Sequence, residues 1–292
     1  MRNASLRKKG DLYILPGGSY LRKGGLEGGN FMSDGKEWYL EYEIHKNRPG
    51  LLGEVSSLLG ALGINILTIN GVDHERRGLL VSSQDDQQMD QVLATIKKME
   101  TIHLTKFRQP TLGDRLAVRH GRYIERDTGD RNTFLFSRDE IGLLVDFMAE
   151  LFKMPDHPLL GIRGLPRVGK SESIIAASVS ANKRWQFVSS TLLKQTVRTR
   201  LSEDERSRDH IFVIDGAVSQ RIGSESHWEL IRELMRLPVT KVIEHPDTFV
   251  RGTEFSMDIF DYIIELRSHR EEEILNGASP AASDFSWPDF NS

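Results

Sequence analysis

Gly164-Leu165-Pro166-Arg167-Val168-Gly169-Lys170-Ser171 is the stretch that decides how this chain is read. It fits the pattern G-x-x-x-x-G-K-[ST] at every specified position, a pattern typical of loops that wrap phosphate groups. Its two glycines permit backbone conformations that other residues avoid, so the N–H groups of the loop can turn toward an anion. Lys170 supplies a positive charge for the phosphates, and Ser171 supplies a hydroxyl for Mg²⁺.

The pattern indicates a phosphate site only between a strand and a helix, and the flanking residues meet that condition. Leu159-Leu160-Gly161-Ile162 precedes it as an apolar strand, and a helix with an apolar face from Ile174 to Val179 follows. The N-terminal dipole of that helix favours anions. We therefore predict a P-loop that binds ATP or GTP. The predicted nucleotide-binding residues are Gly164, Arg167, Val168, Gly169, Lys170, Ser171 and Glu172.

A second apolar strand ends in an acid, in Ile211-Phe212-Val213-Ile214-Asp215-Gly216. Because the carboxyl ends of parallel strands line one crevice, Asp215 is expected to reach the Mg²⁺ ion there. Ser171 and Asp215 are the predicted metal ligands, and Lys170 and Asp215 the predicted catalytic residues. Two plainer interpretations stay open. The glycine-rich loop is then only a turn, and Asp215 only caps the next segment.

Residues 133–270 carry further strand patterns separated by helical ones, which predicts a mostly parallel sheet covered by helices. Ser137-Arg138-Asp139-Glu140 fits a capping box that opens a helix. The expected strands are 133–136, 159–162, 186–189, 211–215, 239–243 and 262–266.

Residues 36–108 show a different order, strand–helix–strand–strand–helix–strand, with apolar residues alternating in the strands and recurring on one face of each helix. This order favours an antiparallel ferredoxin-like sheet with both helices on one face, so the chain as a whole is of the α/β class. The expected elements are strand 37–44, helix 51–62, strands 64–72 and 78–83, helix 85–96 and strand 102–107.

With the loop Asn47-Arg48-Pro49-Gly50-Leu51 and the stretch Gly63-Ile64-Asn65-Ile66, this half resembles an ACT domain. The resemblance implies a regulatory module that often dimerises and binds amino acids between subunits. It implies an effector site at Asn47, Gly50, Leu51 and Asn65. In the plainer interpretation, Pro49-Gly50 only turns the chain into its helix. The two-part arrangement from about Met32 to about Arg270 also resembles the YmfK family of Gram-positive bacteria, a resemblance that brings no activity with it.

The other segments give weaker patterns. Residues 1–35 are rich in glycine and basic residues, which predicts a disordered tail, or an upstream extension if Met32 is the true start. Residues 109–132 are expected to form a polar linker, in which Arg115, Arg119, Arg122 and Arg126 share one face if it is helical. Residues 271–292 are expected to form a flexible tail.

Composition excludes several classes of function. The 292 residues contain no cysteine, which rules out disulfides, thiolate metal sites and cysteine nucleophiles. The net charge of −3 gives no global attraction to nucleic acid or membrane, and no apolar run approaches the roughly 18 residues of a membrane span. We expect a cytoplasmic protein and a homodimer formed through the ACT-like half. Its expected partners are a nucleotide and an amino-acid effector, without nucleic acid.

Two motifs that are common in nucleotide hydrolases are missing from this sequence, and their absence limits the reactions to be expected. Gly216 follows Asp215 where many ATPases carry glutamate, and Asn182-Lys183-Arg184-Trp185 does not fit the guanine-reading pattern of GTPases. ATP is therefore the expected nucleotide. The first hypothesis is a small-molecule kinase or slow NTPase regulated at the ACT-like half. The alternatives are a non-enzymatic, nucleotide-dependent sensor acting through a protein partner, or an interaction protein with two degenerate modules.

Overall fold

The computed structural model describes residues 35–130, 132–193 and 196–269, together with three short strands near the N-terminus. These are β1 (Lys8–Lys9), β2 (Leu12–Ile14) and β3 (Tyr20–Arg22), paired in an antiparallel sheet. The expectations for the rest of residues 1–34, including Met32, and for the tail 271–292 lie outside the described residues.

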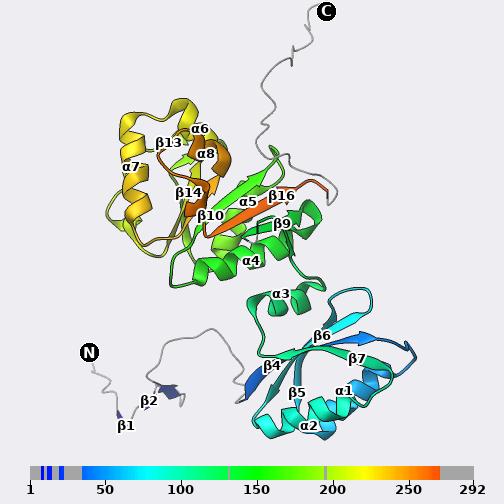
Figure 1. Cartoon of the computed structure of the whole chain (residues 1–292). Helices are drawn as coiled ribbons and strands as arrows, with labels where there is room; N and C mark the ends of the chain where they lie inside the picture. The colour runs from blue at the N-terminus through cyan, green and yellow to red at the C-terminus, as the bar shows by residue number, and fades with distance from the viewer. Residues whose placement is uncertain are drawn as a thin grey trace, which may run out of the picture.

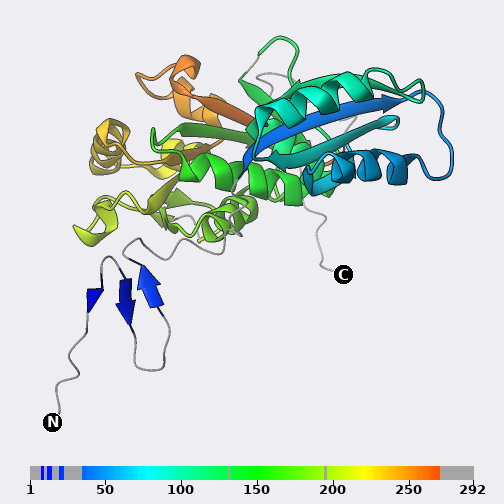
Figure 2. The same ribbon diagram turned by 90° about the horizontal axis from the view of Figure 1, so that it is seen from below.

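The N-terminal domain has the predicted order of elements around a four-stranded antiparallel sheet, β5-β6-β4-β7. Its helices α1 and α2 lie side by side on one face of the sheet (Figure 1, Figure 2). Asp85 accepts a hydrogen bond from the Gln87 N–H and so caps α2. The elements are β4 (Lys36–Ile44), α1 (Leu51–Ala61), β5 (Asn65–Gly71), β6 (Arg76–Ser83), α2 (Asp86–Ile96) and β7 (Ile102–Arg108).

The opposite face of this sheet is covered by a helix that the linker prediction for residues 109–132 missed. Helix α3 (Leu112–His120) buries Ala117 and Val118 against Tyr39 and Leu80. Thr111 and Asp114 form a capping box at its start. The prediction of a solvated linker is therefore wrong for this stretch. Its apolar residues are so few that their signal was hidden among the arginines, two of which, Arg122 and Arg126, follow the end of the helix.

The C-terminal domain contains a seven-stranded sheet in the order β11-β14-β15-β10-β16-β9-β8. Every pair from β11 to β9 is parallel, and only the edge strand β8 is antiparallel, which confirms the predicted mostly parallel sheet. The strands are β8 (Glu125–Arg126), β9 (Thr133–Ser137), β10 (Leu159–Gly164), β11 (Arg184–Phe187), β14 (His210–Asp215), β15 (Lys241–Glu244) and β16 (Tyr262–Arg267). A separate pair joins β12 (Ser189–Ser190) and β13 (Thr196–Val197).

Helices cover both faces of the large sheet. Helices α4 (Ile141–Lys153) and α5 (Lys170–Ser180) pack their apolar residues into one core, and α7 (Glu225–Arg236) and α8 (Pro246–Arg251) contribute to a second core. The predicted capping box of Ser137 and Glu140 is present and leads through a short 3₁₀ turn into α4. The remaining helix is α6 (Gly216–Ile222), directly after β14.

Helix α3 lies between the two domains in Figure 1. The side chains of Arg119 and His120 contact the Asp146 carboxylate of α4, each at 3.0 Å. In the part of the chain that the structure describes, no helix is long and apolar enough to cross a membrane.

Candidate functional site

The glycine-rich stretch 164–169 forms the connection between β10 and α5, as expected. Three of its residues have positive φ angles, Gly164 at +152°, Arg167 at +64° and Gly169 at +114°. A Cβ atom on Gly164 would lie 2.5 Å from the Leu266 carbonyl oxygen, so only glycine fits there. Backbones that alternate between ordinary and positive φ form concavities in which N–H groups bind anions.

Lys170 is the first residue of α5 and is 6% exposed. Its Nζ atom donates hydrogen bonds to the carbonyl oxygens of Gly164 (2.8 Å) and Leu165 (2.9 Å). Burial lowers the pKa of Lys170, and the nearby carboxylates, Glu244 foremost, act in the opposite direction. Among the described residues no carboxylate forms an ion pair with Nζ, so this buried cation is held over the loop by carbonyl dipoles alone.

The Ser171 side chain forms a hydrogen bond with an acidic residue, Glu244, that the sequence patterns did not single out. Its hydroxyl donates to the Glu244 Oε1 atom at 2.6 Å. Glu244 ends β15, which pairs directly with β10, so the sheet brings it beside the loop. Burial raises the pKa of Glu244 to about 6, although the Ser171 hydrogen bond acts against this rise. The available signal was an apolar strand that ends in an acid, as in the strand of Asp215.

Asp215 ends β14 and lies in register with Glu244 on the neighbouring strand. It is 2% exposed, and its two oxygens accept hydrogen bonds from the Val218 N–H (3.0 Å) and the Thr191 hydroxyl (2.6 Å). The first of these bonds makes Asp215 the N-cap of α6, which is the plainer alternative left open by the sequence.

The side-chain oxygens of Ser171, Asp215 and Glu244 lie near the carboxyl ends of β14 and β15, and they can be compared with the ligands that a metal ion requires. Within the described residues there is no group of three or more His, Cys, Asp and Glu residues that could hold a metal ion by itself. Mg²⁺ commonly uses only one or two carboxylates and completes its octahedron with water and substrate phosphates. Ser171 and Asp215 fit that requirement at the carboxyl edge of the sheet, and Glu244 lies next to them through its hydrogen bond with Ser171.

The other residues predicted to contact the nucleotide differ in the exposure of their side chains. Arg167 is exposed, and its carbonyl accepts a hydrogen bond from Arg138 at 3.4 Å. Val168 turns its side chain into the core and is 2% exposed, so only its backbone faces the loop. Glu172 is exposed in the first turn of α5.

The four predicted effector residues do not meet within one chain. Asn47, Gly50 and Leu51 lie at the N-terminal end of α1, whereas Asn65 begins β5 after the C-terminal end of that helix. An eleven-residue helix is about 17 Å long, which separates the two groups. Asn65 instead lines a hollow of about 330 Å³ beside Gly63 and Gln88.

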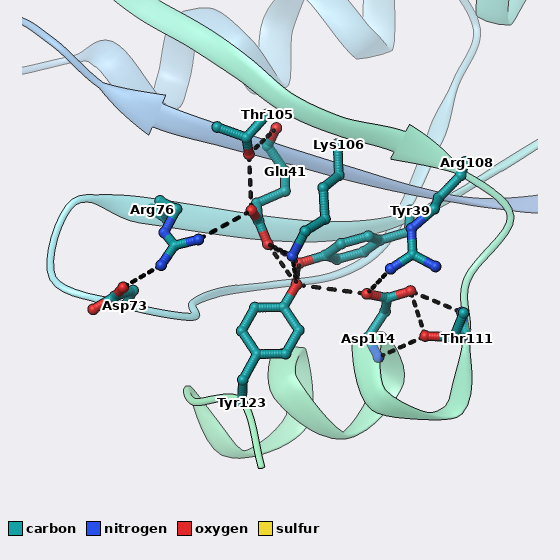
Figure 3. A network of polar contacts seen from close by, with 10 residues as sticks. All are labelled: Tyr39, Glu41, Asp73, Arg76, Thr105, Lys106, Arg108, Thr111, Asp114 and Tyr123. Carbon is teal, nitrogen blue, oxygen red and sulfur yellow. Dashed lines mark hydrogen bonds and ion pairs between the residues drawn. The ribbon is translucent and has the colours of Figure 1, made fainter. Parts of the chain in front are cut away.

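A buried carboxylate on the opposite face of the sheet from α1 and α2 organises a polar cluster (Figure 3). Glu41 is fully buried and accepts hydrogen bonds from Tyr39 (2.8 Å), Tyr123 (2.5 Å), Thr105 (2.8 Å) and Lys106 (3.0 Å). Burial alone would raise the pKa of Glu41, but these hydrogen bonds outweigh it and hold the pKa below its usual value. We call these five residues the Glu41 cluster. It fastens the segment after α3 to the sheet.

Comparison with known proteins gives a family match on each half of the chain. Residues 38–101 match the ACT domain, and residues 104–292 match the family described as "Protein of unknown function (DUF3388)". The uncharacterised protein YmfK of Bacillus subtilis (strain 168) is 60% identical over 256 residues, which cover 88% of this chain and 95% of that protein.

Among solved structures, phospho-2-dehydro-3-deoxyheptonate aldolase (DAHP synthase) from Thermotoga maritima matches at 9% identity, over 78% of this chain and 87% of its own. Its TM-score is 0.20, which carries no argument about fold or function.

Proposed function

This chain belongs to the DUF3388 family, whose description assigns no activity, and we propose from its own residues that it binds ATP with Mg²⁺ at residues 164–171. The observation that carries the proposal is the buried ammonium of Lys170 over a loop with three positive φ angles. A buried cation without a carboxylate partner is costly, and a phosphate anion would supply the missing negative charge.

The residues fit a nucleotide with its metal. Bound ATP would supply the transferable phosphoryl group, and Mg²⁺ would neutralise charge on its β and γ oxygens. Lys170 would exchange its two carbonyl partners for phosphate oxygens, and the first turn of α5 would add its N–H groups. Ser171 would turn its hydroxyl oxygen to the metal. Asp215 would lie near the metal, and Glu244 would keep its hydrogen bond to Ser171.

Glu244 supports a phosphotransferase or slow NTPase over simple binding. A carboxylate with a pKa of about 6 is ionised at neutral pH and basic enough to accept a proton from an attacking hydroxyl or water. Its Oε1 atom already holds the Ser171 hydroxyl at 2.6 Å. We therefore assign Glu244, rather than a residue following Asp215, as the general base.

A non-enzymatic sensor remains the second candidate, and Gly216 favours it. A Cβ atom there would lie 2.8 Å from the Phe249 Cβ and 2.9 Å from the His245 carbonyl oxygen. A glutamate therefore cannot occupy the position after Asp215 without moving the backbone. If Glu244 does not act as a base, ATP would be held without useful turnover and would act through a protein partner.

The ACT domain would regulate this site through a second copy of the chain. Because Gly50 and Asn65 lie at opposite ends of α1, an amino acid contacting both requires two chains. We propose a homodimer that presents the α1 N-terminus of one chain to β5 of its partner.

Calorimetric titration of Mg²⁺-ATP tests the proposal. The unaltered protein should bind with micromolar affinity, and Lys170→Ala should weaken binding at least about 100-fold, because about 3 kcal/mol of charged contact is lost. Lys98→Ala, which removes an exposed lysine after α2, is the matched control and should bind normally. Equal affinity in Lys170→Ala would reduce the loop to a structural turn.

Phosphate release from ATP then separates the two candidates. With candidate acceptors present, turnover that falls at least about 100-fold in Glu244→Gln while ATP affinity persists supports the enzyme. ATP binding with no phosphate release under any condition supports the sensor.

A further inference from the structure

A second cavity lies away from the glycine-rich loop, between the α3 segment and the C-terminal domain. It encloses about 500 Å³, a volume within the range of small-molecule sites. The C-terminal domain lines it with an apolar surface, consisting of Phe134, Phe147, Leu151, Met154 and Tyr262. The Phe134 and Phe147 rings lie 4.8 Å apart, and the Tyr262 ring stands edge-on to Phe147. Flat or branched apolar groups pack well on such a surface.

The other side of the cavity is polar and carries an excess of positive charge. Asp114 and Arg108 form an ion pair there at 2.9 Å (Figure 3). The backbone N–H and the hydroxyl of Thr111 both donate hydrogen bonds to the other oxygen of Asp114. Arg126 lies with its guanidinium 4.7 Å from the centre of the Phe134 ring. It has no carboxylate partner within the described ranges, so its charge remains available beside the apolar surface.

We infer that this cavity binds a small apolar carboxylic acid, with its hydrocarbon or aromatic body on Phe134, Phe147 and Tyr262 and its carboxylate on Arg126. One available guanidinium matches one negative charge, and its planar N–H groups suit a carboxylate. Asp114 would repel that carboxylate, but Arg108 offsets its charge and Thr111 donates hydrogen bonds to its other oxygen. This acid site differs from the ACT effector positions, none of which lines the cavity.

The acid site is joined to the glycine-rich loop by α4. At its first residue, Ile141 places its Cδ1 atom 3.3 Å from where a Cβ on Gly169 would lie, and Arg138, in the 3₁₀ turn before α4, donates a hydrogen bond to the Arg167 carbonyl oxygen. Further along, Phe147 and Leu151 line the cavity. An acid that orders α4 at one end therefore restricts the loop at the other, and would change ATP affinity if the proposed function holds.

The test is calorimetric titration of the full-length protein, without nucleotide, with four acids: 3-phenylpropionate, indole-3-acetate, 4-methylpentanoate and octanoate. At least one should bind, and its neutral amide should bind at least about tenfold more weakly, because the Arg126 contact is lost. Arg126→Glu should weaken the acid at least about tenfold, whereas Arg184→Glu, the same change on exposed β11, should leave it unchanged. Met154→Trp should fill the cavity and abolish binding.

Amide hydrogen exchange with the bound acid provides a second measurement. Residues 141–153 and 165–169 should exchange more slowly in the acid complex, with or without any affinity for ATP. Failure of all four acids to bind would overturn the inference. So would an acid that binds Arg126→Glu or Met154→Trp as well as the unaltered protein. None of these results depends on nucleotide, so they are distinct from failure of the proposed ATP site.

Discussion

At the scale of single residues, the two glycines of the loop are required for different reasons. Gly169 combines a φ of +114° with open space except for Ile141, so a side chain there meets mainly backbone strain. Gly164 combines a φ of +152° with a backbone carbonyl 2.5 Å from any Cβ, and a carbonyl in a sheet cannot move aside. Motif and packing therefore agree most closely at Gly164.

Gly164→Ala should lower the free energy of unfolding by more than about 2 kcal/mol, because strain and a backbone clash add. Gly53→Ala, in the first turn of α1 with nothing near its Cβ position, should instead stabilise the protein by about 0.5 to 1 kcal/mol. Urea unfolding of the two variants and the unaltered protein measures both effects. A Gly164→Ala protein as stable as the unaltered one would contradict the packing argument.

Glu244 makes stability depend on pH in a defined direction. Its pKa is about 6 when folded against 4.5 as the reference value, so the folded state binds its proton more tightly. This contribution is complete below about pH 4.5 and is lost as the pH rises through about 6. At neutral pH the ionised group therefore costs the fold about 2 kcal/mol.

Glu244→Gln removes that cost while keeping an oxygen for Ser171. Its free energy of unfolding should exceed that of the unaltered protein by about 2 kcal/mol more at pH 7.5 than at about pH 4.5. Urea unfolding at the two pH values measures this, with the exposed Glu229→Gln as a control that should show no such change. A difference that is independent of pH would mean that Glu244 is not buried as described.

At the scale of elements, α3 is held to the sheet by its own short apolar face and, through Tyr123, by the Glu41 cluster. Tyr123 follows α3 and donates its hydroxyl to Glu41, while Lys106 reaches the same hydroxyl from β7 at 2.8 Å. Removing one partner from a fully buried carboxylate costs more than an average hydrogen bond, because desolvation is no longer compensated.

Tyr123→Phe should lower the free energy of unfolding by about 1 to 3 kcal/mol and speed amide exchange in residues 112–120. Tyr262→Phe also removes a tyrosine hydroxyl, but this hydroxyl forms no hydrogen bond with the described residues. The free energy of unfolding should therefore change little. If both variants behave alike, the cluster does not hold α3.

At the scale of the whole molecule, two features favour association with a second chain. The predicted effector residues lie at opposite ends of α1, and β5 is an edge strand. Among the described residues β5 pairs with β6 alone and is an edge strand, and Leu67, at a break in its register with β6, is 39% exposed. Such an edge is a ready template for pairing with another copy.

Leu67→Lys should convert the proposed dimer to a monomer, because a charge on an edge strand opposes pairing. Val179→Lys, which places the same charge at a 60% exposed residue on α5 of the C-terminal domain, should leave the dimer intact. Sedimentation equilibrium distinguishes one chain mass from two. Sedimentation of the unaltered protein as a monomer at all concentrations would remove the dimer from the proposal.

Local patterns predicted the order of elements well, because alternation and helical periodicity are properties of neighbouring residues. Their failures are equally physical. Val179 belongs to an apolar helical pattern but is 60% exposed, since α5 presents that turn to solvent. Helix α3 has too few apolar residues to show a period. Neither error could be corrected without knowing which surface each helix covers.

Residue type and short spacing were enough to predict the glycine-rich loop, the strand before it, the helix after it and the absence of cysteine chemistry, because these features involve only neighbouring residues or composition. The hydrogen bond between Ser171 and Glu244 could not be predicted in this way, since β15 and β10 are neighbours in space and far apart in the chain. The cavity beside Arg126 likewise exists because β16 and the α3 segment meet across the domain boundary. Strand order and domain packing are set by the burial of whole faces, which no short stretch of sequence records.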